Sequence, residues 1–358
     1  MALEMDFAVA VHCVIKEAII VKTSYSVLFL LLLAAPIGLA QELSKSGGAG
    51  VQIPMNAFVR WDEAMNEFVA FRNTSSSPEY SLEIYDATGN KRTVDILKDF
   101  PQAMGATIVN VAFGPNGEIL VVCRLRSSNS LLLKQLILTY SPSLTLEKVW
   151  DVAPYDPTAI AVDQQGNVYS LGTTYTEKNP SESYPMLIEY DPNGHIKNEF
   201  LPRSTFSSVD DPVSNSKKMG FVAMKATDSR IFIYLPVAKA MLTLDTSGKI
   251  LKQFEVSDTF QRLTYEKGYA KFDVHEDYIS AQGKLWLGLM LRNPPPSTQS
   301  SPNFISLIVE VDADGQATVH HAEEGTFSMR LAGLNSLNEP LVLDVISPAV
   351  GVPKIGIH

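Results

Sequence analysis

Cysteine is almost absent from this chain of 358 residues, which contains only Cys13 and Cys123. Cys13 lies in an N-terminal segment that we expect to be removed, so the mature chain has no partner for an internal disulfide. Cys123 lies in the apolar segment 120–124, a setting typical of an inert, buried thiol. Stability is therefore expected to come from packing in the core and not from covalent links.

Basic residues are also few, and the formal net charge is −10. An acidic chain argues against nucleic acid or an anionic membrane as a partner. Helical periodicity is nearly absent, which points to an all-β fold.

Local catalytic signatures are missing as well. The chain has no Gly-x-Ser-x-Gly, no His-Glu-x-x-His and no glycine-rich phosphate-binding loop. This counts against an enzyme, although ligands dispersed along the chain would leave no local motif.

The N-terminus resembles an export signal. Lys22 precedes an apolar run at 27–35, which ends at Pro36 and is followed by small residues up to Ala40. The run is shorter than the roughly 20 residues of a spanning helix. Residues 1–40 are therefore predicted to be a signal peptide whose true translation start lies nearer Val21. The protein is predicted to be periplasmic or extracellular, with no stable membrane span after cleavage.

The rest of the chain is organised around one repeated hairpin. Residues 159–172 form two short apolar strands joined by a turn at Gly166. Similar hairpins occur at 58–71, 109–122, 221–234, 275–289 and 329–345. A second hairpin type lies between them, at 81–94, 135–149, 186–200, 240–256 and 306–320. Alternating hairpins at roughly 50-residue spacing predict a β-propeller.

The order of elements in residues 159–200 resembles a blade of the NHL-repeat and senescence-marker-like lactonase superfamily. The order begins with an inner strand and an Asp-x-x-Gly turn. Two further strands, a second such turn and a fourth strand come after them. The resemblance covers most of residues 55–345 and implies six four-stranded antiparallel blades, with seven left open. A flexible lead-in at 41–50 would precede a single propeller domain at 51–358. Either 346–358 or 51–55 would complete the last blade.

The resemblance also has implications for a cofactor. The lactonases hold a divalent metal in the channel through carboxylate and asparagine ligands on different blades, but no motif maps those ligands onto this sequence. Asp312-x-Asp314-Gly is too short for a calcium loop, and we expect Asp312 to cap its own turn. His275 and Asp277 would share one face of a strand while Glu276 faces away, which leaves too few ligands for zinc. No cofactor is predicted, with a divalent metal in the channel left open.

Long loops are predicted on the face opposite the Asp-x-x-Gly turns, and function is expected there. Arginines and asparagines end the second strands of three blades on that face: Arg72, Asn73, Arg124, Arg126, Arg292 and Asn293. They would ring one mouth of the channel and bind an oxyanion. Three tyrosines in nearby loops would stack on a sugar or peptide: Tyr155, Tyr175 and Tyr265. The alternative is that each arginine simply packs its stem and extends its head into water.

The sequence thus predicts an exported propeller that acts as a binding module for a small molecule, glycan or protein. The leading alternative is a metal-dependent hydrolase or lactonase with its site in the channel. A third hypothesis is a scaffold subunit of an envelope complex, which would use the flat faces of the propeller.

Overall fold

A computed structural model describes residues 57–71, 81–86, 90–127, 132–174, 184–205, 222–236, 239–293, 304–324, 329–335, 338–346 and 354–357. The chain divides into two compact units, 1–44 and 45–358, and all described residues belong to the second. The predicted signal peptide at 1–40 and lead-in at 41–50 lie outside the described residues.

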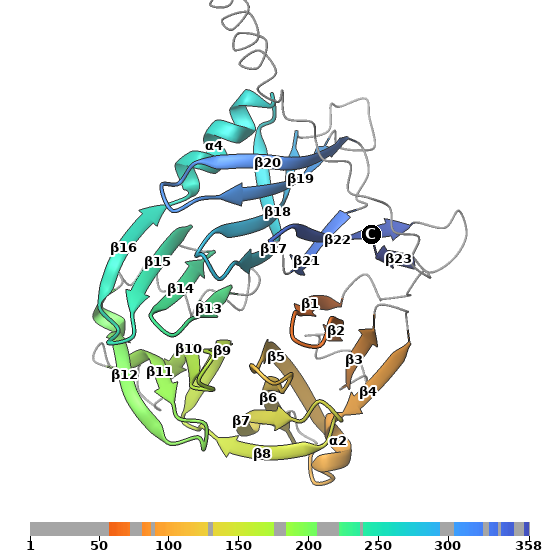
Figure 1. Cartoon of the computed structure of the whole chain (residues 1–358), viewed down its shortest axis with the longest axis vertical. Helices are drawn as coiled ribbons and strands as arrows, with labels where there is room; N and C mark the ends of the chain where they lie inside the picture. The colour runs from red at the N-terminus through yellow and green to blue at the C-terminus, as the bar shows by residue number, and fades with distance from the viewer. Residues whose placement is uncertain are drawn as a thin grey trace, which may run out of the picture. The chain divides into compact units, whose positions relative to one another are not determined.

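Five four-stranded sheets surround a common centre, each an antiparallel meander in chain order (Figure 1). The first two sheets contain β1 (Phe58–Asp62), β2 (Glu67–Phe71), β3 (Ser81–Asp86) and β4 (Lys91–Asp95), then β5 (Gly105–Phe113), β6 (Ile119–Arg126), β7 (Leu132–Tyr140) and β8 (Leu146–Asp151). The third contains β9 (Tyr155–Val162), β10 (Val168–Thr174), β11 (Pro185–Tyr190) and β12 (Ile196–Pro202). The remaining two contain β13 (Met224–Ala226), β14 (Arg230–Leu235), β15 (Ala240–Asp245) and β16 (Ile250–Glu255), then β17 (Lys271–Ile279), β18 (Leu285–Arg292), β19 (Phe304–Val311) and β20 (Ala317–Glu324). The predicted all-β propeller with four-stranded antiparallel blades is confirmed.

The last sheet differs from the other five. It has three strands, β21 (Met329–Leu334), β22 (Pro340–Ile346) and β23 (Lys354–Ile357). The sequence predicted six four-stranded blades with seven left open, but the described residues form five complete blades. The C-terminal strand β23 pairs with β22, so residues 346–358 contribute to this sheet as one of the two alternatives expected.

The turns within the blades follow from their sequences. Asp163 accepts hydrogen bonds from the backbone N–H groups of Gln165 and Asn167, and Gly166 has a φ of 82°. Asp312 accepts in the same way from the N–H groups of Asp314 and Gln316, which confirms that it caps its own turn. In each turn, the aspartate carboxylate accepts hydrogen bonds from backbone N–H groups that have no strand partner.

The hydrophobic core lies between neighbouring sheets. Leu82 and Ile84 of β3 belong to the same buried cluster as Val121 and Leu125 of β6. Other clusters join each later four-stranded sheet to the next one along the chain. Inner strands such as β5 are nearly fully buried, as expected when each sheet is covered on both faces.

The described residues include two α-helices that the sequence analysis did not predict. A ten-residue helix, α4 (Ser257–Glu266), contains Tyr265, which the sequence analysis placed in a loop. Its buried residues Phe260 and Leu263 recur at helical spacing, and the Phe260 ring lies 5.3 Å from that of Phe272 in β17. The short helix α2 (Ile96–Asp99) begins at Asp95, which caps it.

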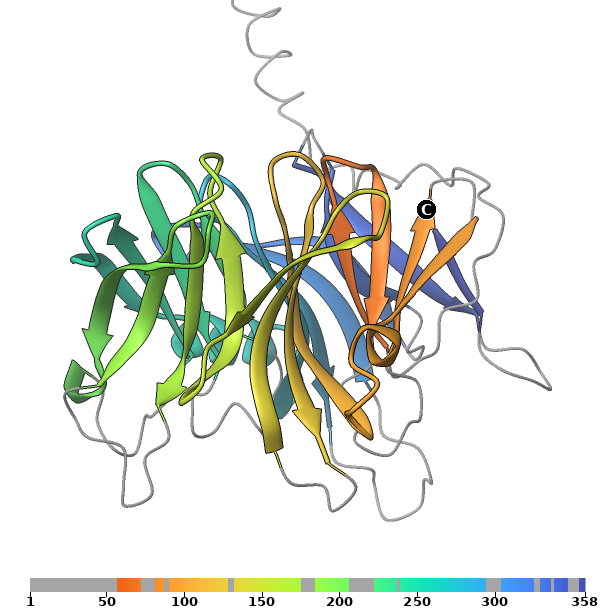
Figure 2. The same ribbon diagram turned by 90° about the horizontal axis from the view of Figure 1, so that it is seen from below.

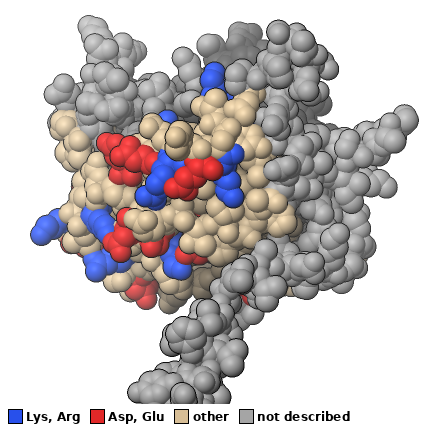
Figure 3. Space-filling view, turned by 90° about the horizontal axis from the view of Figure 1, so that it is seen from above, with Lys and Arg blue, Asp and Glu red and all other residues tan. Residues whose placement is uncertain are grey.

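Buried ion pairs join different sheets. The Arg124 side chain of β6 donates to Asp156 of β9 at 2.6 Å, and Arg330 of β21 donates to Glu276 of β17 at 2.7 Å. Arg330 also donates to the backbone oxygen of Ala57, at the start of β1. On the described part of the surface that Figure 3 shows, acidic and basic side chains lie next to one another.

Candidate functional site

A cavity of about 490 Å³ lies where the first strands of the five four-stranded sheets converge. Its walls come from the C-terminal ends of β1, β5, β9, β13 and β17 and from the turns that follow them. Figure 2 shows the hairpin turns of the first sheets at one edge of the ring, and the cavity opens among these turns. It therefore lies at the opposite end of the strands from the loop-bearing face on which the sequence predicted the function.

One wall of the cavity carries a buried ion pair. The guanidinium of Arg60 in β1 lies 3.4 Å from a carboxylate oxygen of Asp277 in β17, and both side chains are largely buried. Burial raises the pKa of Asp277 to about 7, the Arg60 charge opposes this rise, and the neighbouring Glu276 adds to it. Arg60 and Asp277 are therefore paired with one another.

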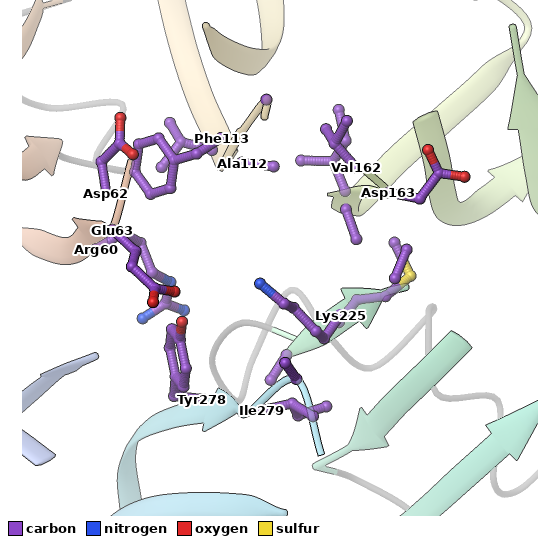
Figure 4. Close-up of a pocket in the computed structure, with 18 of the residues that line it drawn as sticks. Arg60, Asp62, Glu63, Ala112, Phe113, Val162, Asp163, Lys225, Tyr278 and Ile279 are labelled. Atoms are coloured by element: carbon purple, nitrogen blue, oxygen red, sulfur yellow. The ribbon is translucent and has the colours of Figure 1, made fainter. Parts of the chain in front are cut away.

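Lys225 extends from β13 into the cavity, toward the side formed by Arg60, Glu63 and Tyr278 (Figure 4). Within the described part of the chain, no carboxylate lies within ion-pair distance of its ammonium group. Burial lowers the pKa of Lys225, while the more distant charge of Glu63 acts in the opposite direction. Among the described residues that line the cavity, Lys225 is the cation that has no ion pair.

Glu63 and Tyr278 face Lys225 across the cavity (Figure 4). Glu63 is exposed, whereas the Tyr278 ring is partly buried. Burial, followed by the negative charge of Glu63, raises the pKa of Tyr278 to about 12, so its hydroxyl keeps its proton at neutral pH. The cavity therefore offers an ammonium group, a hydroxyl donor and a carboxylate acceptor.

Three further polar groups of the walls, Asp62, Asn110 and Asp163, are engaged in local structure; Asp163 accepts from the N–H groups of Gln165 and Asn167. Asp62 accepts hydrogen bonds from the N–H groups of Ala64 and Met65, and burial raises its pKa to about 6. Asn110 donates to the backbone oxygen of Thr158 and accepts from the N–H of Val111. These residues shape the walls and are not free to bind a ligand through the same atoms.

This donor set does not fit the divalent metal of the lactonases. No group of three or more His, Cys, Asp or Glu side chains converges among the residues that the structure describes. The carboxylates of Asp62 and Asp277 are occupied, and the ammonium of Lys225 points into the space that a cation would need. Lys225 thus supplies a positive charge for an anionic ligand, while the carboxylates of Asp62, Glu63, Asp163 and Asp277 also line the cavity.

Apolar side chains complete the walls. Ile279 lies beside Lys225, whereas Ala112 and Val162 lie across the cavity from it, and the three come from different sheets (Figure 4). The walls therefore combine apolar side chains with polar ones, as sites for small molecules do.

The residues predicted from the sequence lie elsewhere, and their proposed role stays a prediction. Arg124 is paired with Asp156, Arg292 with Asp273 at 2.6 Å, and Asn293 donates to the backbone oxygen of Gly268. Arg126 is partly buried at the end of β6. None of these four lines the cavity. Arg72, Asn73 and Tyr175 lie outside the described residues.

Two of the tyrosines are not in loops, contrary to prediction. Tyr155 begins β9 and is 3% exposed, and its hydroxyl donates to the backbone oxygens of Ser170 and Met186. Tyr265 lies in α4 and is 85% exposed. The Tyr155 side chain is therefore part of its own sheet and is not available to stack on a ligand.

The pairing expected for His275 and Asp277 is also wrong. A bulge in β17 between Val274 and Glu276 interrupts the alternation of side chains along the strand. His275 is exposed, whereas Glu276 and Asp277 are both buried and form separate ion pairs with Arg330 and Arg60.

Comparisons with known proteins show no family. No family model matches the chain, and no curated protein matches it. A gluconolactonase from Xanthomonas campestris is 9% identical, with a TM-score of 0.46 over 86% of this chain and 88% of that one. A luciferin-regenerating enzyme is 9% identical, with a TM-score of 0.45 over 86% and 90%. An auxiliary nutrient binding protein from Bacteroides ovatus is 12% identical, with a TM-score of 0.43 over 86% and 72%.

At these TM-scores and identities, the likenesses carry no argument about what this chain binds or catalyses. Among the described helices, none has the length and apolar character needed to cross a bilayer.

Proposed function

We propose that this protein is an exported β-propeller that binds a small anionic organic molecule in its central cavity. The observation that carries the proposal is the Lys225 ammonium, which points into the cavity without an ion-pair partner among the described residues. A partly buried ammonium without a counter-charge is unfavourable, and an anionic ligand would supply that charge.

The surrounding groups narrow the class of ligand. Because Arg60 lies 3.4 Å from Asp277, Lys225 is the cavity cation without an ion pair among the described residues, and it would attract a carboxylate or phosphate. Glu63, on the far side of the cavity, would accept a hydrogen bond from a hydroxyl or amine of the same ligand. A cavity of about 490 Å³ is within the range of small-molecule sites, so a hydroxy acid, amino acid or sugar acid would fit.

Export is supported by the predicted signal peptide, in which a charged residue, an apolar run and small residues follow one another before residue 41. We also propose that β21–β23 serves as a sixth blade. Arg330 of β21 is bonded on one side to Glu276 of β17 and on the other to Ala57 before β1, which supports closure of the ring through this sheet.

A thermal-shift screen of purified residues 41–358 against small carboxylates, sugar acids and phosphates tests the proposal. Ligands that bind the native state but not the unfolded state raise the melting temperature, and the shift grows with the logarithm of the ratio of ligand concentration to Kd. We expect at least one carboxylate or phosphate to stabilise the wild type but not Lys225→Met. Lys267→Met, which changes an exposed lysine of the α4 C-terminus, is the matched control. A stabilising ligand that acts equally on Lys225→Met would contradict the proposal.

A further inference from the structure

We propose that Lys225 captures carbonyl-bearing ligands as a reversible imine, with 2-oxo acids as the class that fits best. This inference rests on the proposed function because it uses the same cavity and the same lysine. It adds a covalent step to what would otherwise be binding by charge alone.

The first argument is the contrast between Lys225 and the lysines of the outer strands. Four outer lysines are held by carboxylates within 3.0 Å: Lys91 by Glu83, Lys197 by Glu189, Lys252 by Asp314 and Lys284 by Glu310. Lys225 has no such partner among the described residues, and unlike these four lysines it extends into the cavity.

The second argument is position. β13 is only three residues long, but β14 fixes its backbone through the register Met224 to Ile233, Lys225 to Phe232 and Ala226 to Ile231. Lys225 extends into the cavity beside Ile279, and its nitrogen ends in open space (Figure 4). A nucleophilic lysine needs an accessible nitrogen in a partly desolvated setting. Burial lowers the pKa of Lys225 and so increases the fraction of free amine at neutral pH.

The reaction balances without an oxidant or reductant. The Lys225 ammonium first loses a proton to Glu63 or to water, and the lone pair of its Nζ then adds to the carbonyl carbon. One of the two remaining amine protons moves to the carbonyl oxygen to give a carbinolamine. The hydroxyl then leaves as water, taking one proton, and a C=N bond remains. Hydrolysis reverses the same steps and releases the ligand unchanged.

Groups opposite Lys225 suit this chemistry. Glu63 faces the nitrogen across the cavity, where its carboxylate can relay a proton and offset the charge of a protonated imine. The Tyr278 hydroxyl lies on the same side, as a donor for the carbonyl oxygen. In a 2-oxo acid the carbonyl carbon is bonded directly to the carboxylate carbon. The carboxylate that the Lys225 ammonium attracts therefore brings the carbonyl carbon close to Lys225 Nζ.

Reductive trapping tests the inference. Full-length mature protein is incubated with pyruvate and sodium cyanoborohydride at neutral pH, and modified lysines are located by peptide mass spectrometry. Labelling at Lys225 is expected to exceed labelling at the exposed Lys267 by at least tenfold. Lys267→Met is expected to label at Lys225 as the wild type does.

Lactate, which has no carbonyl beside its carboxylate, separates this inference from the proposed function. Lys225→Arg keeps the positive charge but offers no imine-forming amine. We expect lactate to stabilise both the wild type and Lys225→Arg, and pyruvate to label only the wild type. If lactate stabilises the wild type but pyruvate labels Lys225 no more than Lys267, the imine is refuted and anion binding stands. If Lys225 is labelled but carbonyl-free anions do not bind, the imine stands and the proposed anion site is refuted.

Discussion

Replacing Arg330 by methionine tests how the last sheet is held to its neighbours. Arg330 links β21 to Glu276 of β17 and to the backbone oxygen of Ala57, and both charged side chains are about one-tenth exposed. Methionine keeps most of the stem, so the loss is mainly electrostatic. Removing one partner of a buried pair costs about 3–5 kcal/mol because the other charge stays buried. The lost bond to Ala57 adds roughly 1 kcal/mol.

The structure supplies a matched control for this variant. Arg292 and Asp273 form an ion pair at 2.6 Å, nearly the same distance as the 2.7 Å between Arg330 and Glu276. The exposed pair has side-chain exposures of 46% and 38%, compared with 11% and 7% for the buried pair. Arg292→Met is expected to cost only about 0–1 kcal/mol, since solvent screens such pairs.

Urea unfolding measures both variants. With a slope of about 3 kcal/mol per molar urea, Arg330→Met should lower the midpoint by roughly 1–2 M. Glu276→Gln in the Arg330→Met background removes the unpaired charge and should recover part of the loss. If Arg330→Met costs no more than Arg292→Met, burial does not govern the strength of these pairs and the reasoning is refuted.

Three further predictions concern protonation, close packing and reactivity. The carboxyl of Asp277 has its pKa raised from 3.8 to about 7 in the folded protein, so the folded state binds an extra proton between these values and stability falls by a few kcal/mol as the pH rises through them. Relative to Asp277→Asn, the wild type should therefore lose stability from pH 4 to pH 7 in urea titrations; parallel pH profiles would contradict this. A Cβ added at Gly172 would lie 2.4 Å from the backbone oxygen of Asp156, so Gly172→Ala should lower the free energy of unfolding by about 1–3 kcal/mol, and an unchanged urea midpoint would argue against that close approach. Burial raises the pKa of Cys123 to about 12, so a thiol reagent should react with it only after denaturation; fast reaction in native buffer would show that the strand is open.

Much of the fold could be predicted because each hairpin carries its own local signal. Residues such as Asp163 and Gly166 determine a turn through contacts within a few positions, and the flanking apolar runs mark the strands. Helix α4 was missed because its buried face shows only Phe260 and Leu263 as large apolar residues, which is a short pattern to recognise.

The candidate site could not be predicted in the same way. Arg60, Lys225 and Asp277 are far apart in the sequence and meet only when three sheets close around one axis. Asp277 also depends on the bulge in β17, which changes the face to which the following residues point. Arginines at strand ends were an easier pattern to see, but Arg124 and Arg292 already have acidic partners.

Calorimetric titration of the most stabilising anion from the screen tests the central claim most directly. The wild type, Lys225→Arg, Lys225→Met and the control Lys267→Met are compared under one set of conditions. A hydrogen bond to a charged group contributes about 1.5–3 kcal/mol, so Lys225→Met should weaken binding by roughly tenfold to a hundredfold, and Lys267→Met should not change it. An affinity for Lys225→Met equal to that of the wild type would contradict the assignment of the anion to the central cavity.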